Sequence, residues 1–501
     1  MEIELKFIVP EERFDAVEAA VKQGEFKVTS MQAHYFDTPG KALASRGIAL
    51  RLRKEGDRWI QTVKAMGHSL VAREEHNVEV HGFAETGPVP DTSLHHGSVA
   101  GDLLLEALDA SAETLVEIYH TKIERITRDI PLVGGVVELA LDNGLVQTYG
   151  GPSKGNSAPV RELEMEVKEG ELQAVVQTAI DWIARHGLFL STISKAERGE
   201  RLLAAHWGRP AEKAKPLTAD HGALPAGREL QKLVVGHCLH QVMSNASELA
   251  EGGGTDAHVH QLRVGLRRLR TALRELAGLA DGSFDPKWEA PLKRVLRRLG
   301  ELRDRGQALE RFGHRLRDAG APPMARLKSA DMSAAQIIRS ADFQQTLVQL
   351  LAFTATTDEG IAEDSSLSPK ATRRALAKRV KRLFKRATRD IVGFQEWAPE
   401  DQHRVRKRLK RLRYLAEFLG PAMKHGHQSF LKRLKPAQSA LGALNDHQVA
   451  EALYRTIAAE DPRAWFAVGW LAAQREQLLT DCDRTLQRVR KPPAFQHGAF
   501  R

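Results

Sequence analysis

The first residues of the chain, Met1-Glu-Ile-Glu-Leu-Lys6, alternate between polar and apolar side chains and end on a lysine. In a β-strand the side chains of Glu2, Glu4 and Lys6 share one face, because successive side chains point to opposite sides. Carboxylates can hold a hard divalent cation, and the ammonium group can contact an anion bound to that cation. The spacing favours a site for a metal-bound polyanion such as a phosphate chain. A solvated amphipathic strand is the alternative.

Charged and apolar side chains alternate again in later segments of the first two hundred residues. These segments are 48–54, 57–64, 73–80, 136–144 and 161–168. The alternation predicts strands that pack on one face and carry charge on the other. We expect an antiparallel sheet that curves or closes on itself, with the charged faces inside and helices covering part of the outside. A turn at Asn143-Gly144 is expected to end the fourth segment.

The interior of such a sheet needs both signs of charge, because like charges crowded in a lumen are costly unless they are compensated. The negative charge comes from Glu2, Glu4, Asp142, Glu162 and Glu164. The positive charge comes from Lys6, Arg51, Arg53, Lys64, Arg125 and Lys195. Such a mixed set suits a phosphate chain bound with Mg²⁺, which bridges carboxylates to phosphate while the cations clamp the remaining oxygens.

The same residues carry a resemblance to a known superfamily. Glu2-x-Glu4-x-Lys6 resembles the ExExK signature of the CYTH, or triphosphate tunnel metalloenzyme, superfamily. Further matching motifs follow in order: Arg51-x-Arg53, Thr62-x-Lys64, Arg73-x-Glu75, Arg125, Glu138-Leu-Ala-Leu-Asp142-x-Gly144, Glu162-x-Glu164-x-Glu166 and Ser194-Lys195-Ala-Glu-Arg198-Gly199. The resemblance covers about residues 1–205 and implies an eight-stranded antiparallel tunnel, similar to that of bacterial inorganic triphosphatases.

The resemblance also implies an activity and its residues. The expected reaction converts inorganic triphosphate to pyrophosphate and phosphate, with Mg²⁺ as the cofactor and Mn²⁺ as an alternative ion. The expected catalytic residues are Glu2, Glu4, Lys6, Lys64, Arg125 and Lys195. The resemblance further implies that the acidic residues named above, Glu2, Glu4, Asp142, Glu162 and Glu164, hold the metal ions. It implies that the basic residues named above, together with Arg73, bind the substrate. Two alternatives stay open: a scaffold that binds polyphosphate without turnover, and a CYTH enzyme acting on a nucleoside or thiamine triphosphate, adenylate cyclase chemistry included.

The second half of the chain has helical periodicity and an internal repeat. The run that starts at His260 resembles the run that starts at His403, and a Leu-Gly-x-Leu-x-Asp motif follows each run, at 299–304 and 441–446. Two similar helical bundles follow from this duplication. On a helix the basic residues of each run share one face, opposite the leucine residues. These basic residues are His260, Arg263, Arg267 and Arg270 in the first repeat, and His403, Arg406, Lys410 and Arg413 in the second.

The two basic runs and the two Leu-Gly-x-Leu-x-Asp motifs resemble the CHAD domain, a conserved histidine α-helical domain. The resemblance covers about residues 225–495 and implies that inorganic polyphosphate binds along a basic surface shared by the two bundles. Like charges at helical spacing repel by a few tenths of a kcal/mol per pair, and an anionic ligand would reverse that penalty. A solvated basic face without a ligand is the alternative.

The predicted fold class is α+β and multidomain. It combines an N-terminal antiparallel eight-stranded β-tunnel and its flanking helices with a C-terminal all-α pair of bundles. The expected bounds are 1–205 for the tunnel domain, 206–226 for a linker, and 227–495 for the helical domain, whose repeats lie at about 227–350 and 368–490.

Charge and composition restrict the partners and the compartment. The net charge is +10, and residues 370–435 hold 21 Lys and Arg against 5 Asp and Glu, so we expect an acidic partner. Nucleic acid is disfavoured, because the basic helices hold almost no aromatic residues for stacking on bases. Membrane-length apolar runs and a disulfide framework are both missing, which favours a cytoplasmic protein, with association to polyphosphate granules as a further expectation. The oligomeric state stays open.

Overall fold

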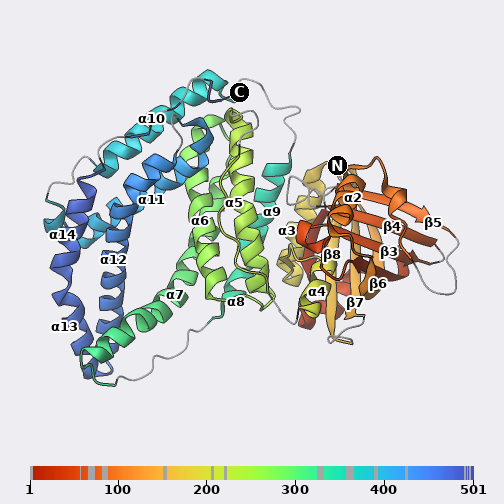
Figure 1. Ribbon diagram of the computed structural model, residues 1–501, viewed down its shortest axis with the longest axis horizontal. Helices are drawn as coiled ribbons and strands as arrows, with labels where there is room; N and C mark the ends of the chain where they lie inside the picture. Colours follow the sequence, from red (N-terminus) through yellow and green to blue (C-terminus); the bar gives the residue numbers. More distant parts are fainter. Residues whose placement is uncertain are drawn as a thin grey trace. The chain divides into compact units, whose positions relative to one another are not determined.

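The structure is a computed structural model of the 501-residue chain (Figure 1). It describes residues 4–56, 58–65, 74–81, 89–149, 155–204, 208–218, 223–323, 332–356, 366–388, 393–423, 427–489, 492–493, 495 and 498–500, with the backbone alone for 303–309. The chain forms two compact units. Unit 1 consists of Met1–Glu212, Met243–His258 and Ile338–Thr356, and unit 2 consists of Lys213–Val242, Val259–Ile337 and Thr357–Arg501.

Unit 1 is built on one antiparallel sheet. Its strands are β1 (Glu4–Ile8), β2 (Lys27–Asp37), β3 (Ala49–Glu55), β4 (Arg58–Ala65), β5 (Glu74–Val80), β6 (Val116–Leu132), β7 (Gly135–Thr148), β8 (Ser157–Gly170) and β9 (Phe189–Leu190). They follow the order β5-β4-β3-β2-β6-β7-β8-β1-β9 across the sheet. The expected antiparallel architecture is confirmed. The sheet has nine strands rather than eight, and among the described strands β5 and β9 are edges that do not pair with each other, so hydrogen bonds do not close it.

The sheet is nevertheless strongly curved. Five strands separate β1 from β4, so Glu4 and Lys64 would lie roughly 29 Å apart in a flat sheet, at about 4.8 Å per strand. Burial and Glu164 raise the pKa of Glu4, while the charge of Lys64 acts in the opposite direction. Charges separated by three Debye lengths would not interact in this way. The two side chains therefore face each other across a concave surface.

That concave face collects the charged residues, because residues directly opposite each other on paired strands share a face. Lys6 on β1 lies opposite Glu164 on β8. Asp142 on β7 lies opposite Glu162 on β8 and Arg125 on β6. The pairing of the remaining strands continues the same face through Arg53, Arg51, Lys64 and Glu75.

One expected turn is wrong. Strand β7 continues through Asn143 and Gly144 to Thr148, and Gly144 lies opposite Ile123 on β6. A Cβ atom on Gly144 would lie 2.0 Å from the carbonyl oxygen of Lys122. The glycine therefore permits the close approach of β6 and does not form a turn.

Helices cover the outer face of the sheet and reach into its concave face. In unit 1 the helices are α1 (Phe14–Val21), α2 (Val99–Ser111), α3 (Leu172–His186), α4 (Lys195–Leu203) and α9 (Ala341–Ala355). Leu104 of α2 packs against Leu50, Leu52 and Val63 on the outer face. On the opposite face, Leu202 of α4 packs among buried residues of the central strands. Helix α4 therefore belongs to the interior of the curved sheet.

The remaining helices are α5 (Gly227–Ala250), α6 (Asp256–Leu276), α7 (Glu289–Asp318), α8 (Ala334–Ile338), α10 (Pro369–Thr388), α11 (Pro399–Phe418), α12 (Gln428–Ala458), α13 (Trp465–Ala473) and α14 (Arg475–Leu486). Short 3-10 helices lie at Glu11–Arg13, Ala44–Arg46, Thr92–His95, Ala277–Leu279, Pro286–Trp288, Phe394–Glu396, Gly420–Ala422 and Pro462–Ala464. Unit 2 has no strand among its described residues, which confirms the expected all-α region. No described helix is long and apolar enough to cross a membrane.

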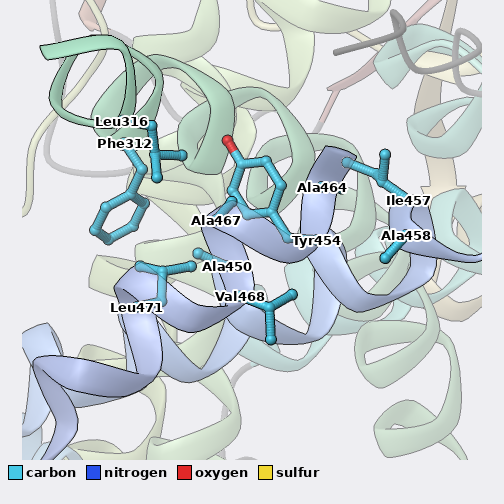
Figure 2. Close-up of a cluster of buried hydrophobic side chains, with 10 residues drawn as sticks. All are labelled: Phe312, Leu316, Ala450, Tyr454, Ile457, Ala458, Ala464, Ala467, Val468 and Leu471. Atoms are coloured by element: carbon cyan, nitrogen blue, oxygen red, sulfur yellow. The ribbon is translucent and has the colours of Figure 1, made fainter. Parts of the chain in front are cut away.

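Apolar packing holds α7, α12 and α13 together in unit 2. Phe312 and Leu316 of α7 meet Tyr454 of α12 and Leu471 of α13 in one buried cluster (Figure 2). Burying side chains of this size contributes about 1.5–3 kcal/mol each. The cluster therefore joins α7, which follows the first basic run, to α12 and α13, which follow the second.

Reciprocal ion pairs join the two repeats through α6 and α11. Nη1 of the buried Arg268 lies 2.6 Å from Oε2 of Glu417. Arg411 occupies the position equivalent to Arg268 in the second repeat, and its Nη1 lies 3.5 Å from Oε1 of the buried Glu275. Buried charges need such partners, because an unpaired charge inside a protein is strongly destabilising.

Two glycine residues at matching positions of the repeat differ in their surroundings. Gly442 on α12 has open space where a Cβ atom would lie, whereas a Cβ atom on Gly300 of α7 would lie 2.5 Å from Nη1 of the buried Arg263. We expect Gly442→Ala to raise the free energy of unfolding by about 0.5–1 kcal/mol, because alanine is the better helix former. Gly300→Ala must also displace Arg263 and should be the less stable of the two in urea unfolding followed by circular dichroism. Equal stability of the two variants would show that Arg263 moves aside at no cost.

Candidate active site

Three carboxylates converge on one ammonium group in the concave face. Nζ of Lys195 lies 2.8 Å from Oδ2 of Asp142, 2.7 Å from Oε2 of Glu162 and 2.9 Å from Oε1 of Glu164. One oxygen atom of each carboxylate lies within 4.8 Å of the others. Asp142 and Glu162 have no exposed surface, so this is a buried charge cluster.

Arg125 contacts the same cluster from β6. Its Nε and Nη2 donate hydrogen bonds of 2.6 and 2.7 Å to the two oxygen atoms of Asp142, and Nη2 also donates to Glu164. This bidentate geometry is the strong form of an arginine–carboxylate contact. The contact with Arg125 therefore fixes the orientation of the Asp142 carboxylate.

Neighbouring cations hold Glu162 and Glu164 in the ionised form. Burial alone would raise the pKa of Glu162, but Lys195, Lys6 and Arg198 outweigh this effect and lower it to about 2. Burial likewise opposes ionisation of Glu164, yet Lys195 and Arg125 bring its pKa well below the usual range. The same contacts raise the pKa of Lys195 well above its usual range against the effect of burial.

Local sequence explains how Lys195 reaches the cluster. Ser194 caps α4, because its Oγ accepts a 3.1 Å hydrogen bond from the backbone N–H of Glu197. Lys195 is the first residue of that helix. Four residues on, a Cβ atom at Gly199 would lie 2.4 Å from the ring of Tyr119. The Ser-Lys-x-x-x-Gly motif therefore combines a helix cap, a cation and a close contact with the sheet.

A second group of cations lies on β3 and β4. Nη2 of Arg53 pairs with Glu55 at 2.6 Å, and Nζ of Lys64 pairs with Glu75 at 2.5 Å. Burial and Arg51 lower the pKa of Arg53 to about 10, and the same two causes lower the pKa of Lys64. The buried Nε atoms of Arg51 and Arg53 make no hydrogen bond within the described residues. An anion is the ligand that would relieve this crowding of positive charge.

Two of the predicted site residues lie on β1, and two others lie outside the part of the chain that the structure describes. Lys6 donates to the backbone oxygen of Ile193, and its charge also acts on Glu162 and Glu164. Glu4 faces the same interior. Glu2 and Arg73 lie outside the described residues.

The donor set fits a hard divalent cation. Carboxylate oxygens are the ligands that Mg²⁺ and Ca²⁺ prefer, and Asp142, Glu162 and Glu164 supply three within reach of one point. Their shared contact with the ammonium group of Lys195 shows that the cluster already stabilises a cation there. These three residues could therefore hold a metal ion.

The basic residues of unit 2 differ in their surroundings. Arg263 is buried, Arg270 pairs with Glu289, and Arg413 pairs with Glu417 at 2.6 Å. The ring Nδ1 of His403 lies 3.1 Å from Oδ1 of Asn445. This contact joins the second basic run to the second Leu-Gly-x-Leu-x-Asp motif.

Basic residues of the two repeats crowd each other on α6 and α11. Burial lowers the pKa of Lys410 to about 7, and Arg406 of its own helix and Arg267 of the other repeat add to the effect. Burial, Arg270 of α6 and other cations likewise lower the pKa of Lys407. The two runs therefore contribute to one basic surface.

Sequence reasoning gave no role to some residues of the site. Arg198 was part of a matched motif, but its contact with Glu162 at 3.2 Å depends on how α4 meets β8. Tyr35 shares the interior face with Arg51, which lies opposite it on β3, and it forms a hydrogen bond with that arginine. The parity of β2 was the signal that could have revealed Tyr35.

The fold and the site agree with two domain families. Residues 1–199 match the model of the CYTH domain, and residues 233–455 match the model of the CHAD domain. The chain therefore combines a CYTH domain with a CHAD domain.

Relatives of both parts are known. The inorganic triphosphatase of Haemophilus influenzae is 26% identical over 168 residues, which are 33% of this chain and 44% of that protein. The aligned region thus spans less than half of that relative. The CHAD domain from the plant Ricinus communis is 24% identical, covers 57% of this chain and 99% of that chain, and has a TM-score of 0.46. HpAC1 from Hippeastrum is 17% identical, covers 41% of this chain and 96% of that chain, and has a TM-score of 0.28.

The charge cluster predicts a large effect of Lys195 on the stability of unit 1. Lys195→Met leaves the buried carboxylates with Arg125 and Arg198 as their remaining countercharges, so we expect a loss of about 3–5 kcal/mol in the free energy of unfolding at neutral pH. Because the pKa of Glu162 is lowered to about 2 in the folded protein, its stabilisation is present above the ordinary pKa of 4.5 and is lost as the pH falls from there towards 2. The variant should therefore lose most of this acid dependence in urea unfolding between pH 2.5 and pH 7.

The matched control is Lys168→Met, which removes an ion pair of 2.7 Å between Lys168 and Glu138. Lys168 is exposed, so the loss should stay below about 1 kcal/mol. Equal losses in the two lysine variants would contradict the central place of Lys195.

Proposed function

We propose that unit 1 hydrolyses inorganic triphosphate to pyrophosphate and phosphate in a metal-dependent reaction, and that unit 2 binds inorganic polyphosphate. The observation that carries the first part is the arrangement of opposite charges on one concave face. Three carboxylates surround Lys195, and the cations Arg51, Arg53 and Lys64 lie on strands of the same face. A triphosphate bound with a divalent cation matches both groups at once.

The proposed cofactor is Mg²⁺, with Mn²⁺ as a substitute. Asp142, Glu162 and Glu164 would hold it, together with Glu2 and Glu4 from the start of the chain. The ion would neutralise charge on the phosphate oxygens and lower the pKa of a bound water. Phosphoryl transfer depends mainly on positioning and on stabilisation of charge, so few other groups are required.

The basic residues would grip the substrate. Arg51, Arg53 and Lys64 would contact its phosphate oxygens, and Arg73 and Lys6 would extend this contact. Arg125 and Lys195 now neutralise the carboxylates. A metal ion held by the carboxylates would neutralise their charge instead, and Arg125 and Lys195 would then contact phosphate.

The relatives support this choice of substrate over the alternatives. The matched Haemophilus influenzae protein is an inorganic triphosphatase. The residues that grip phosphate suit any triphosphate, so nucleoside and thiamine triphosphates are the competing substrates. A scaffold that binds polyphosphate in unit 1 without turnover is the rival of another class.

The activity is tested by phosphate release from inorganic triphosphate in the presence of Mg²⁺. Glu162→Gln should lower the rate by more than the roughly 10–100-fold typical of losing a residue that only supports a metal ligand. Arg267→Ala in unit 2 is the control and should leave the rate unchanged. A parallel panel with nucleoside and thiamine triphosphates ranks the substrates by kcat/KM.

Two outcomes would contradict the proposal. No phosphate release with Mg²⁺, Mn²⁺ or any other divalent ion would favour the non-catalytic scaffold. A higher kcat/KM for a nucleoside or thiamine triphosphate would replace the proposed substrate.

Polyphosphate binding by unit 2 is supported by the crowded cations of α6 and α11. His260, Arg263, Arg267, Arg270, His403, Arg406, Lys410 and Arg413 are the proposed binding residues. A chain of phosphates would offset the mutual repulsion that lowers the pKa of Lys410 to about 7. Such binding would also bring the protein to polyphosphate granules in the cell.

Lys410 makes polyphosphate binding dependent on pH. Its pKa is lowered to about 7 in the free protein, and a bound polyanion raises it, so binding takes up a proton. The affinity should therefore be highest below about pH 7 and fall by up to about tenfold per pH unit above it. Burial and the neighbouring cations Lys407 and Arg406 lower the pKa of His403, so this residue titrates at lower pH. Isothermal titration calorimetry with polyphosphate between pH 6 and pH 9 measures this dependence.

Lys410→Arg keeps its charge throughout that range and should bind with nearly constant affinity. Lys435→Arg, at an exposed position on α12, is the control and should retain the pH dependence of the wild-type protein. A wild-type affinity that does not change with pH would contradict the role of Lys410.

A further inference from the structure

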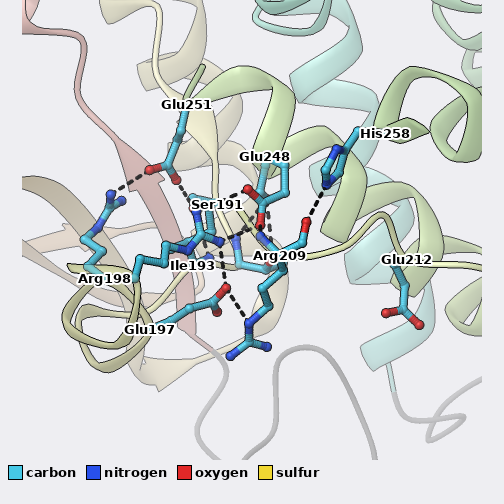
Figure 3. A network of polar contacts seen from close by, with 12 residues as sticks. Ser191, Ile193, Glu197, Arg198, Arg209, Glu212, Glu248, Glu251 and His258 are labelled. Carbon is cyan, nitrogen blue, oxygen red and sulfur yellow. Dashed lines mark hydrogen bonds and ion pairs between the residues drawn. The ribbon is translucent and has the colours of Figure 1, made fainter. Parts of the chain in front are cut away.

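Arg198 on α4 is shared by two carboxylates of unit 1, and Figure 3 shows its contact with one of them, Glu251. Its Nε lies 3.2 Å from Oε1 of Glu162, and its Nη1 lies 2.6 Å from Oε2 of Glu251. Glu162 belongs to the candidate metal site, whereas Glu251 follows the end of α5. Arg198 thus connects Glu251 to the candidate metal site through two ion pairs.

Glu251 also supports the loop that receives Lys6. Oγ of Ser191 donates a 2.5 Å hydrogen bond to Oε1 of Glu251 and accepts a 3.1 Å hydrogen bond from the backbone N–H of Ile193. The carbonyl oxygen of Ile193 accepts the hydrogen bond from Nζ of Lys6. Ser247, one helical turn before Glu251, fixes the same loop through the backbone N–H of Thr192 at 3.0 Å.

We propose that Glu251 is a positioning residue of the metal site, which shares the charge of Arg198 and so keeps Glu162 available to a metal ion. A largely buried guanidinium needs its full countercharge nearby. With Glu251 present, Glu162 supplies only part of that countercharge. Without Glu251, Arg198 would draw Glu162 into a full ion pair that competes with the metal ion.

Two of the residues that organise this site lie outside the stretch that matches the CYTH domain. Ser247 and Glu251 lie within the stretch that matches the CHAD domain, residues 233–455, yet they belong to compact unit 1. The stretch that matches the CYTH domain, residues 1–199, therefore lacks some of the residues that organise its site.

Glu248, in the last turn of α5, offers a matched control. It pairs with Arg201 of α4, its Oε1 lying 2.5 Å from Nη2, and Arg201 in turn pairs with Glu197 at 2.7 Å (Figure 3). Glu248→Gln and Glu251→Gln thus remove the same charge from neighbouring positions and each break an ion pair to α4. The two variants differ in that the partner of Glu251 contacts Glu162.

The inference rests on the proposed metal-dependent function, so its test measures metal binding directly. Mn²⁺ binding to the full-length protein without substrate is followed by electron paramagnetic resonance of free Mn²⁺, and thermal unfolding checks that each variant is folded. We expect Glu251→Gln to weaken Mn²⁺ binding about tenfold, as typical for the loss of a residue that supports a ligand. Glu248→Gln should stay within about threefold of the wild-type protein, and Glu251→Asp, which keeps the charge, should recover most of the affinity.

Different results would overturn the role of Glu251 and the proposed metal-dependent hydrolysis. Equal Mn²⁺ affinities for Glu251→Gln and Glu248→Gln would overturn the role of Glu251 and leave the proposed hydrolysis intact. Binding by Glu251→Asp as weak as that by Glu251→Gln would also overturn it, because charge sharing would then not be the cause. A wild-type protein that binds no Mn²⁺ would overturn both proposals.

Discussion

The contact of one lysine with three buried carboxylates is the interaction on which unit 1 depends. Glu162 and Glu164 could not remain ionised in the interior without a nearby cation, since an isolated buried charge is strongly destabilising. Lys195 supplies that cation only because α4 lies inside the curved sheet. Stability and the proposed binding of a metal ion therefore depend on the same group of charges.

In unit 2, paired charges and crowded charges lie in different places. The pairs Arg268–Glu417 and Arg411–Glu275 compensate the charges that join the two repeats. Along the basic runs, by contrast, burial and the cations of both repeats lower the pKa of Lys410 to about 7. The interior charges of unit 2 are thus paired, whereas cations at one surface repel each other. This arrangement is expected of a binding site for a polyanion.

Sequence periodicity predicted the strands, their charged faces and the helical repeat. It was wrong about Asn143-Gly144, because a glycine that accommodates a neighbouring strand has the same local signature as a glycine in a turn. It also could not show that Arg263 is buried, since a helical face states which residues lie together but not what covers them. The number of strands and the open edges of the sheet likewise depend on pairings between distant segments.

By itself, the sequence determined which residues share a face, because the period of two in a strand and of 3.6 in a helix is a local property of the backbone. Glu4 with Lys6, and Arg406 with Lys410, are examples of this kind. Only the tertiary structure decided which charges meet. Glu162 lies on β8, Arg198 on α4 and Glu251 just after the end of α5, and folding alone brings them into contact. Their distances follow from the packing of the whole unit, which no local pattern contains.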